Sequence, residues 1–247
     1  YYETYDKLML SMGAEPLRPP LPGINLPGVN TLRRIGDMDE IRVEVETALA
    51  EAKASGRKAS AVVVGGGYIG VEMAENLAHR GLDVNLVEMA DQILPPLDRE
   101  MSIPVQQHMQ SRGIKLHLST AVAAFTQKGA RLAVELNNHT TLDADIVIMS
   151  AGVRPSVKLA VEAGIELGEH GGIKVNSQMQ TNDAHIWAAG DGVETPHLVL
   201  PGSYLAPLAG PANREGRVAA DSIMGRKSEY KATQMTSILK VFDMVAG

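Results

Sequence analysis

Three glycines and a glutamate in the first half of the chain have the spacing of a dinucleotide site. Gly65, Gly67 and Gly70 stand between the apolar run 61–64 and an amphipathic segment, and Glu88 follows Gly65 by 23 residues. In a strand–turn–helix unit the first glycine permits the tight turn, the second admits a pyrophosphate, and the third lets the helix pack on the strand. The N–H groups and the dipole at the helix start attract phosphates. The sequence therefore predicts dinucleotide binding here, the alternative being a glycine-rich turn that only packs tightly.

Four further residues lie where chemistry is possible but where ordinary structural roles are also open. Tyr68 and Glu72 flank the start of the same helix. Tyr68 also fits an ordinary half-buried aromatic, and Glu72 fits a carboxylate that the helix dipole favours. Gly190 and Asp191 end the segment TNDAHIWAAGD, where a glycine–aspartate pair also forms a plain turn. The residue types alone do not decide between these alternatives.

The elements that must position these residues alternate along the chain. Apolar runs and amphipathic segments closed by glycines indicate strands at 61–64, 83–88 and 114–118 and helices at 69–80 and 99–112. Short strands of alternating polarity follow near 121–127, 131–136 and 141–149. We predict an α/β fold, in which a Rossmann-like parallel sheet carries an inserted antiparallel meander.

Upstream of that sheet the sequence indicates a crossover and then a helix. Segment 16–27 holds five prolines, which exclude a helix or a central strand and favour a linker between domains. Residues 37–55 form an amphipathic pattern that Asp37 is expected to cap, with Glu40 three residues later. Gly56 is expected to end this helix.

Composition excludes several classes of function. The 247 residues carry a net charge of −6 with no basic block, which disfavours binding to nucleic acid or to an anionic membrane. There is no cysteine, so the chain offers no disulfide, no thiolate metal ligand and no thiol nucleophile. The seven histidines show no paired ligand spacing, and we expect no metal site. No apolar run has the length of a membrane span, and we expect a cytoplasmic protein.

An internal repeat indicates two related folds. Segments 6–16 (DKLMLSMGAEP) and 145–155 (DIVIMSAGVRP) share an aspartate, a serine, a glycine and a proline at one offset, with an apolar strand between them. We interpret both as closing strands of equivalent domains. By this spacing the first copy's opening glycines would precede Tyr1 by roughly 75 residues, so we expect the chain to be an internal piece of a longer protein.

Five segments together resemble the ordered motifs of the FAD-dependent pyridine nucleotide-disulfide oxidoreductases. They are YDKLMLSMGAEP, VVVGGGYIGVEMAENL, IVIMSAGVRP, TNDAHIWAAGD and PLAGPANREGRVAADSIMG, and they span nearly the whole chain. The AGPANREGR segment and the terminal TSILKVFDMVAG are most similar to the branch of coenzyme A-disulfide reductases, NADH oxidases and persulfide reductases.

The resemblance implies residue roles in holding both cofactors. For NADH, Glu88 would bind the adenosine ribose, and four residues would hold the pyrophosphate: Gly65, Gly67, Ile69 and Gly70. Tyr68 would gate the flavin face, Glu72 would lie near the carboxamide, and three residues would pass beside the nicotinamide half: Ala151, Gly152 and Val153. For FAD, the implied residues are Ser11, Gly13 and Arg18 on the FAD side of the crossover, Gly190 and Asp191 at the ribityl chain, and Leu208 and Ala209 at the isoalloxazine edge.

The resemblance also implies a domain plan. Residues 1–30 would be an FAD-domain strand and crossover, 31–153 the NAD(H)-binding domain, 154–237 the return to the FAD-binding domain, and 238–247 the start of a truncated dimerisation domain. The FAD site would be incomplete in this piece, which alone would be inactive, and no residue of this chain would be the catalytic nucleophile. The intact protein would be a homodimer.

The implied activity is hydride transfer from NADH to FAD, and onward to a disulfide, persulfide or oxygen acceptor through a redox cysteine upstream. Two alternatives remain open at this point. One is a cysteine-free flavoprotein reductase that passes electrons to an iron–sulfur or nitrite-reducing partner. The other is a non-catalytic module that senses NADH. The acceptor would be coenzyme A disulfide, persulfide, polysulfide or oxygen.

Overall fold

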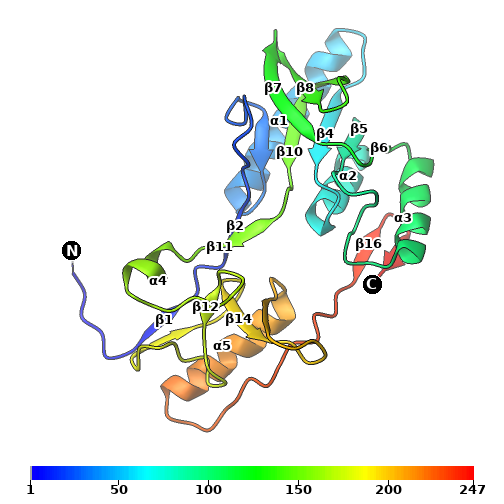
Figure 1. Ribbon diagram of the computed structural model, residues 1–247. Helices are drawn as coiled ribbons and strands as arrows, with labels where there is room; N and C mark the ends of the chain where they lie inside the picture. Colours follow the sequence, from blue (N-terminus) through cyan, green and yellow to red (C-terminus); the bar gives the residue numbers. More distant parts are fainter. Residues whose placement is uncertain (1) are drawn as a thin grey trace. The chain divides into compact units, whose positions relative to one another are not determined.

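The structure is a computed structural model that describes residues 2–247, and the chain forms two compact units (Figure 1). Of the described residues, unit 1 comprises 2–15 and 153–237, and unit 2 comprises 16–152 and 238–247. The chain passes from unit 1 to unit 2 near β2 (Ala14–Pro16) and returns near β11 (Val153–Pro155). Each unit is therefore built from segments that are far apart in sequence.

Unit 2 is centred on a five-stranded parallel sheet in the order β3-β10-β4-β5-β6. The strands are β3 (Val29–Thr31), β4 (Ser60–Val64), β5 (Asp83–Val87), β6 (Lys115–His117) and β10 (Ile146–Met149). Helices α1 (Ile35–Ala54), α2 (Tyr68–His79) and α3 (Arg99–Ser111) connect consecutive parallel strands, as parallel pairing requires. The predicted parallel α/β sheet is confirmed.

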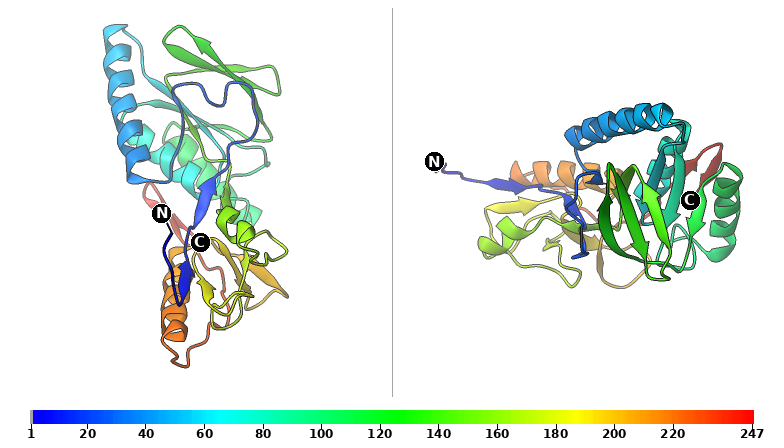
Figure 2. Two further views of the ribbon diagram at one scale, coloured as in Figure 1. Left: turned by 90° about the vertical axis from the view of Figure 1, so that its left-hand side faces the viewer. Right: turned by 90° about the horizontal axis from the view of Figure 1, so that it is seen from above.

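The two faces of this sheet pack against different layers. In β4, Ala61 and Val63 are buried against the three helices, while Val62 is buried against the antiparallel meander on the other side. The meander consists of β7 (Val122–Lys128), β8 (Arg131–Leu136) and β9 (Thr141–Ala144), and Figure 2 shows it across the sheet from α1. Since both faces are covered, the central strands read as continuous apolar runs.

Helix α1 begins earlier than expected. Arg34 is its N-cap residue and Ile35 its first helical residue, so Asp37 is the third residue and not the cap. The Asp37 carboxylate reaches back and accepts hydrogen bonds from the backbone N–H groups of Arg33 and Arg34, both at 2.8 Å. The Arg34 hydrogen bond lowers the pKa of this carboxyl. Asp37 therefore does satisfy the helix start, from inside the first turn.

The predicted strand at 141–149 is wrong as a single element. It is broken at Asp145, so that β9 ends the meander and β10 enters the parallel sheet beside β4. The cause is the Asp145 side chain, which is 4% exposed and bonds Arg57 at 2.7 Å, Arg131 at 3.3 Å and the Ser60 backbone N–H at 2.8 Å. Three long-range partners fix the turn at this residue.

A C-terminal hairpin also belongs to unit 2. Strands β16 (Leu239–Val241) and β17 (Met244–Ala246) pack on α2 and α3, and their apolar residues join the helix-side core. The backbone N–H of Phe242 donates to Glu75 at 2.8 Å, and Asp243 pairs with Arg112 at 2.6 Å. The expectation that residues 238–247 open a dimerisation domain stays a prediction.

Unit 1 pairs β1 (Leu8–Leu10) in parallel with β13 (Ile186–Ala188), which packs on α5 (Ala209–Ile223). A second sheet has the order β12-β14-β15, formed by β12 (Ile173–Lys174), β14 (Val193–Pro196) and β15 (Ser203–Leu205). The short helix α4 (Lys158–Glu162) completes the core around Trp187. Residues from segments 8–12 and 157–230 thus share one core.

The crossover segment 16–30 lies in a different unit from the one expected. Residues 16–30 pack with unit 2 rather than with the strand at 8–10, because β3 pairs with β10 and the Phe125 N–H donates to Pro22 at 2.8 Å. In the described part of the chain, no helix is long and apolar enough to cross a bilayer.

Candidate functional site

The glycine-rich loop between β4 and α2 is held tightly at two of its three motif glycines. Gly65 has φ +109°, and a Cβ there would lie 2.3 Å from the carbonyl oxygen of Ser150. A Cβ on Gly70 would lie 1.9 Å from the Gly65 carbonyl oxygen and 2.7 Å from the Ser150 hydroxyl. Both positions exclude a side chain, because loop, helix and neighbouring strand meet at van der Waals distance.

Gly67 differs from these two because its surroundings are open. It is the N-cap residue of α2 with ordinary extended backbone angles, and a Cβ placed there meets no atom within 4 Å. No side chain caps this helix, so its N-terminus presents backbone N–H groups and the positive dipole end to an open space. Packing does not require glycine at position 67. A ligand at the helix N-terminus would require it, because a side chain there would occupy the space of the ligand.

Glu88 lies beside this loop, directly after β5. Its carboxylate accepts hydrogen bonds from the backbone N–H of Gly66 at 2.6 Å and of Ala90 at 2.7 Å. A Cβ on Gly66 would come within 3.2 Å of the Glu88 side chain, so the middle glycine of the triplet admits this carboxylate. Each oxygen keeps a second lone pair for another donor. The carboxylate is therefore fixed in orientation and still able to accept hydrogen bonds.

Ser150 is a site residue to which the sequence analysis gave no role. Its hydroxyl lies 2.9 Å from the Val64 carbonyl oxygen and 3.1 Å from the Gly65 carbonyl oxygen, and its backbone N–H donates to Val64 at 2.8 Å. These bonds join the end of β10 to the glycine loop. The signal that could have found it is the serine shared by the two repeat segments.

Replacing Ser150 with alanine is expected to lower the stability of the protein by about 1 kcal/mol, because one part-buried hydrogen-bond donor is lost. The Gly65 carbonyl would lose its anchor, so we expect nucleotide affinity to fall more than this stability loss explains. Differential scanning fluorimetry and calorimetric titration with NADH would measure the two effects. An unchanged NADH affinity would show that Ser150 only stabilises the sheet.

Ala151 and Gly152 follow Ser150 at the same sheet edge as the glycine loop. The Ala151 backbone nitrogen lies 3.2 Å from the position a Gly65 Cβ would take, and Gly152 has φ +102°. The Gly152 carbonyl accepts from the Leu17 N–H at 2.9 Å. Ala151 is thus brought to the glycine loop, Gly152 contacts the crossover segment at Leu17, and Val153 begins the segment counted with unit 1.

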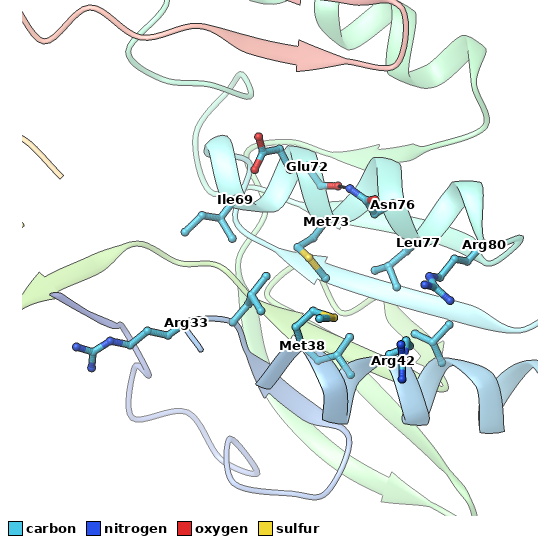
Figure 3. A pocket seen from close by; sticks show the side chains of 12 residues that line it. Arg33, Met38, Arg42, Ile69, Glu72, Met73, Asn76, Leu77 and Arg80 are labelled. Carbon is cyan, nitrogen blue, oxygen red and sulfur yellow. Dashed lines mark hydrogen bonds between the residues drawn. The ribbon is translucent and has the colours of Figure 1, made fainter. Parts of the chain in front are cut away.

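Ile69 and Glu72 line a cavity of about 450 Å³ between α1 and α2. Figure 3 shows these two residues at one end of the cavity, Met38 and Met73 in its middle, and Arg42 and Arg80 at the other end. Tyr68 is not among the lining residues and packs against the helix-side core. The first turns of α2 therefore offer a cavity beside Glu72 and a packed aromatic ring at Tyr68.

The predicted residues of unit 1 gather at one sheet edge. Since β1 and β13 are parallel, Ser11 and Gly13 after β1 leave the sheet on the same side as Gly190 and Asp191 after β13. The Gly13 carbonyl oxygen lies 3.2 Å from the position of a Gly192 Cβ, and Gly190 has φ +91° with open space around it. Local crowding therefore favours glycine at 192, and the positive φ favours it at 190.

Helix α5 contacts this edge through a buried acid. The Gly190 N–H donates to Glu215 at 2.8 Å, and Glu215 has no role in the sequence analysis. The remaining predicted residues, Leu208 and Ala209, form the start of the same helix, where Leu208 is the N-cap and no side chain caps the N–H groups. The structure thus gives unit 1 an uncapped helix N-terminus, as in unit 2.

Arg18 lies elsewhere. It was expected on the FAD-domain side of the crossover, together with Ser11 and Gly13, but its residue range belongs to unit 2. Its guanidinium donates to the carbonyl oxygens of Ile24 at 3.2 Å and Val29 at 3.3 Å. Because prolines have no backbone N–H, this segment has few donors of its own, and the Arg18 guanidinium supplies hydrogen bonds to its carbonyl oxygens.

Comparison with known proteins gives these sites a context. The family profile described as Pyridine nucleotide-disulphide oxidoreductase matches residues 2–206. The NADH oxidase of Methanocaldococcus jannaschii is 39% identical over 245 residues, which are 99% of this chain and 52% of that protein. The chain thus spans about half the length of the curated relatives it matches.

Solved structures agree with the sequence comparison. The reduced CoADR-RHD of Bacillus anthracis superposes with a TM-score of 0.91 at 44% identity, over 99% of this chain and 42% of that one. The NAD-dependent persulfide reductase of A. fulgidus superposes with a TM-score of 0.91 at 35% identity, over 98% of this chain and 44% of that one. With its glycine loop, its parallel sheet and a profile match over most of its length, the chain belongs to the pyridine nucleotide-disulphide oxidoreductase family.

Proposed function

We propose that unit 2 binds NADH and that the intact protein is an FAD-dependent NADH oxidoreductase. The observation that carries this proposal is the open N-cap at Gly67, where packing does not require a glycine, beside a Glu88 carboxylate that is already oriented. The pyrophosphate oxygens would accept hydrogen bonds from the backbone N–H groups in the first turn of α2. Gly65, Ile69 and Gly70 would shape that turn. Glu88 would accept hydrogen bonds from the adenosine ribose.

The nicotinamide half would lie at the same edge of the sheet. Ala151, Gly152 and Val153 follow β10, and their backbone would pass beside this half of the nucleotide. Glu72 would accept from the carboxamide, since its carboxylate is exposed on the first turns of α2. Tyr68 would be the aromatic residue that moves when nicotinamide arrives. These roles follow from the motif positions and agree with the placement of the loop.

Unit 1 offers groups that fit part of an FAD site. Gly190 and Asp191 would meet the ribityl chain, and Leu208 and Ala209 would present the uncapped start of α5 to the isoalloxazine edge. Ser11 and Gly13 would complete the same edge. Arg18 would act only indirectly, because its guanidinium supports the backbone of unit 2.

FAD, when bound, would supply the hydride-accepting chemistry and pass electrons onward. This chain's part is to bind and orient NADH and the flavin, and it holds no cysteine to act as a disulfide or persulfide nucleophile. Relatives are named as an NADH oxidase and a persulfide reductase, so oxygen and persulfides are the acceptor classes that we propose for the intact protein. A homodimer and a cytoplasmic location remain part of this proposal.

Nucleotide choice tests the proposal. NADH is expected to bind at least about tenfold more tightly than NADPH, because Glu88 would repel a 2′-phosphate (~1.4 kcal/mol). The nearby Arg99, a possible phosphate ligand, is paired with Asp91. Calorimetric titration of the protein with both nucleotides measures the ratio, and equal or tighter NADPH binding would contradict the role of Glu88.

Variants of Glu88 separate its role from its structural bonds. Glu88→Arg is expected to reverse the preference toward NADPH, and Glu88→Gln to weaken NADH binding while keeping an acceptor for the Gly66 N–H. Glu46→Arg, on the exposed side of α1, makes the same change of charge elsewhere in unit 2 and is the matched control. If the control shifts the preference equally, general electrostatics and not the ribose contact sets nucleotide choice.

A further inference from the structure

One buried acid in unit 1 has no role in the function proposed so far. Glu215 lies in the second turn of α5 and is 2% exposed. Its carboxyl accepts a hydrogen bond from the Gly190 backbone N–H at 2.8 Å. Glu194, the other buried glutamate of this unit, accepts from two backbone N–H groups, of His170 and Gly172, both at 2.8 Å. Glu215 is thus the less satisfied of the two, and carboxylates are rarely buried unless they are paired.

The bond from Gly190 joins α5 to the loop that carries Asp191. Gly190 has φ +91°, and its carbonyl oxygen accepts a hydrogen bond from the Val193 N–H at 3.0 Å. The Glu215 carboxyl supplies a fixed acceptor for its N–H and so orients the peptide that precedes Asp191. The same helix begins at Ala209, after the N-cap Leu208. One side chain therefore ties the loop to the helix that starts the other half of the proposed flavin site.

The groups around this carboxyl oppose its ionisation. Burial and, to a smaller extent, the charge of Asp191 raise the pKa of Glu215 to about 7, against the Gly190 N–H and Arg214, which favour the ionised form. The buried Thr195 hydroxyl lies near the carboxyl but outside hydrogen-bond geometry. When Glu215 is ionised, it and Asp191 place two negative charges at one loop, in a poorly solvated position.

We propose that Glu215 is a positioning residue of the flavin-binding loop, which fixes Gly190 and Asp191 while its carboxyl is protonated and loosens them when it ionises. The neutral carboxyl still accepts the Gly190 N–H through its carbonyl oxygen, and it removes the repulsion with Asp191. Loss of the proton leaves a buried charge that opening of the loop would solvate. The part of this inference that concerns the flavin rests on the proposed function, whereas the part that concerns the loop does not.

Amide hydrogen exchange of the whole chain tests the loop directly. The protection factor of the Gly190 amide, corrected for intrinsic exchange, is expected to fall about tenfold between pH 6 and pH 8. The reason is that the closed loop binds the Glu215 proton more tightly than the open loop, so loss of this proton favours opening. Glu215→Gln keeps an acceptor without titrating, so its protection should stay constant over this range. Glu215→Ala should lose protection at every pH. Glu194→Gln removes a buried carboxylate from the same unit and should leave the pH dependence at Gly190 intact.

Fluorescence titration with FAD of the same variants, made in the intact protein because unit 1 is proposed to form only part of the FAD site, then separates the two proposals. FAD affinity is expected to fall severalfold between pH 6 and pH 8 in the wild type and to stay level in Glu215→Gln. If no variant binds FAD while Gly190 protection behaves as expected, the flavin role of unit 1 fails and the positioning role stands. If Gly190 protection in the wild type is independent of pH, or if Glu215→Gln shows the same dependence, the inference is overturned.

Discussion

Gly67→Ala is expected to weaken NADH binding strongly and to leave the melting temperature of the protein unchanged, whereas Gly70→Ala is expected to weaken NADH binding and to lower the melting temperature. A Cβ on Gly67 meets no atom within 4 Å and its backbone angles suit alanine, so the apo protein tolerates the methyl group. The methyl group would stand where the pyrophosphate approaches the N–H groups of α2, and we expect affinity to fall roughly 100-fold, or ~2.7 kcal/mol.

The same substitution at Gly70 meets backbone at once. Its Cβ would lie 1.9 Å from the Gly65 carbonyl oxygen, so α2 must move away from β4. Overpacking of this kind costs about 3 kcal/mol, and the movement carries the glycine loop with it. Gly36→Ala in the first turn of α1, with open space around it, is the control.

Thermal melts and NADH titrations of the three variants measure the effect of each methyl group on stability and on NADH affinity. NADH binding by Gly67→Ala at wild-type affinity would place the nucleotide elsewhere. A Gly70→Ala protein with wild-type stability would show that the helix can shift at little cost.

Asp145→Ala is expected to destabilise unit 2 by about 3 kcal/mol or more, since it leaves two guanidinium groups and a backbone N–H without their shared acceptor. The carboxylate is 4% exposed and bonds Arg57, Arg131 and the Ser60 N–H. These contacts join the N-terminal end of β10 to the N-terminal end of β4. Their loss therefore also weakens the pairing of the two strands whose C-terminal ends carry Ser150 and the glycine loop. Urea unfolding measures the free energy, and Asp143→Ala, a partly exposed neighbour that also pairs with Arg131, is the control.

The pH dependence of this contribution has a definite sign. Burial opposes ionisation of Asp145, but the Arg57 and Arg131 guanidinium groups and the Ser60 N–H outweigh it and hold its pKa below the usual value. The unfolded chain therefore binds a proton more readily than the folded one, and the stabilisation is present above about pH 4 and lost as pH falls further. The stability gap between wild type and Asp145→Asn should narrow on acidification. A constant gap would show that the ion pairs contribute little.

Much of unit 2 was predictable because its signals are local. Apolar runs bounded by glycines located β4, α2, β5 and α3 to within a residue or two, since hydrophobic periodicity and helix-ending glycines act within one turn. The glycine motif with its acidic partner identified the loop for the same reason. Resemblance of the whole motif set then gave the family.

Elements fixed by distant partners could not be read in this way. Periodicity continues through Asp145, and only its bonds to Arg57, Arg131 and Ser60 end one strand there and begin another. Asp37 has the composition of an N-cap, yet the helix starts at Ile35 and uses the carboxylate from inside its first turn. The strand break at Asp145 and the helix start at Ile35 both depend on hydrogen-bond geometry. The hydrophobic pattern of the sequence does not distinguish these positions from their neighbours.

The α/β architecture, the glycine loop and the family of this protein follow from its sequence, because spacing along a strand–turn–helix unit is a property of neighbouring residues. The packing of residues 16–30 with unit 2, the anchoring of the loop by Ser150 and the burial of Glu215 against Gly190 follow from the folded structure alone. Each of the latter contacts joins segments separated by at least 25 residues. A serine or a glutamate on a helix or strand has no local mark of its distant partner, and burial, which gives Glu215 its raised pKa, exists only after the chain has folded.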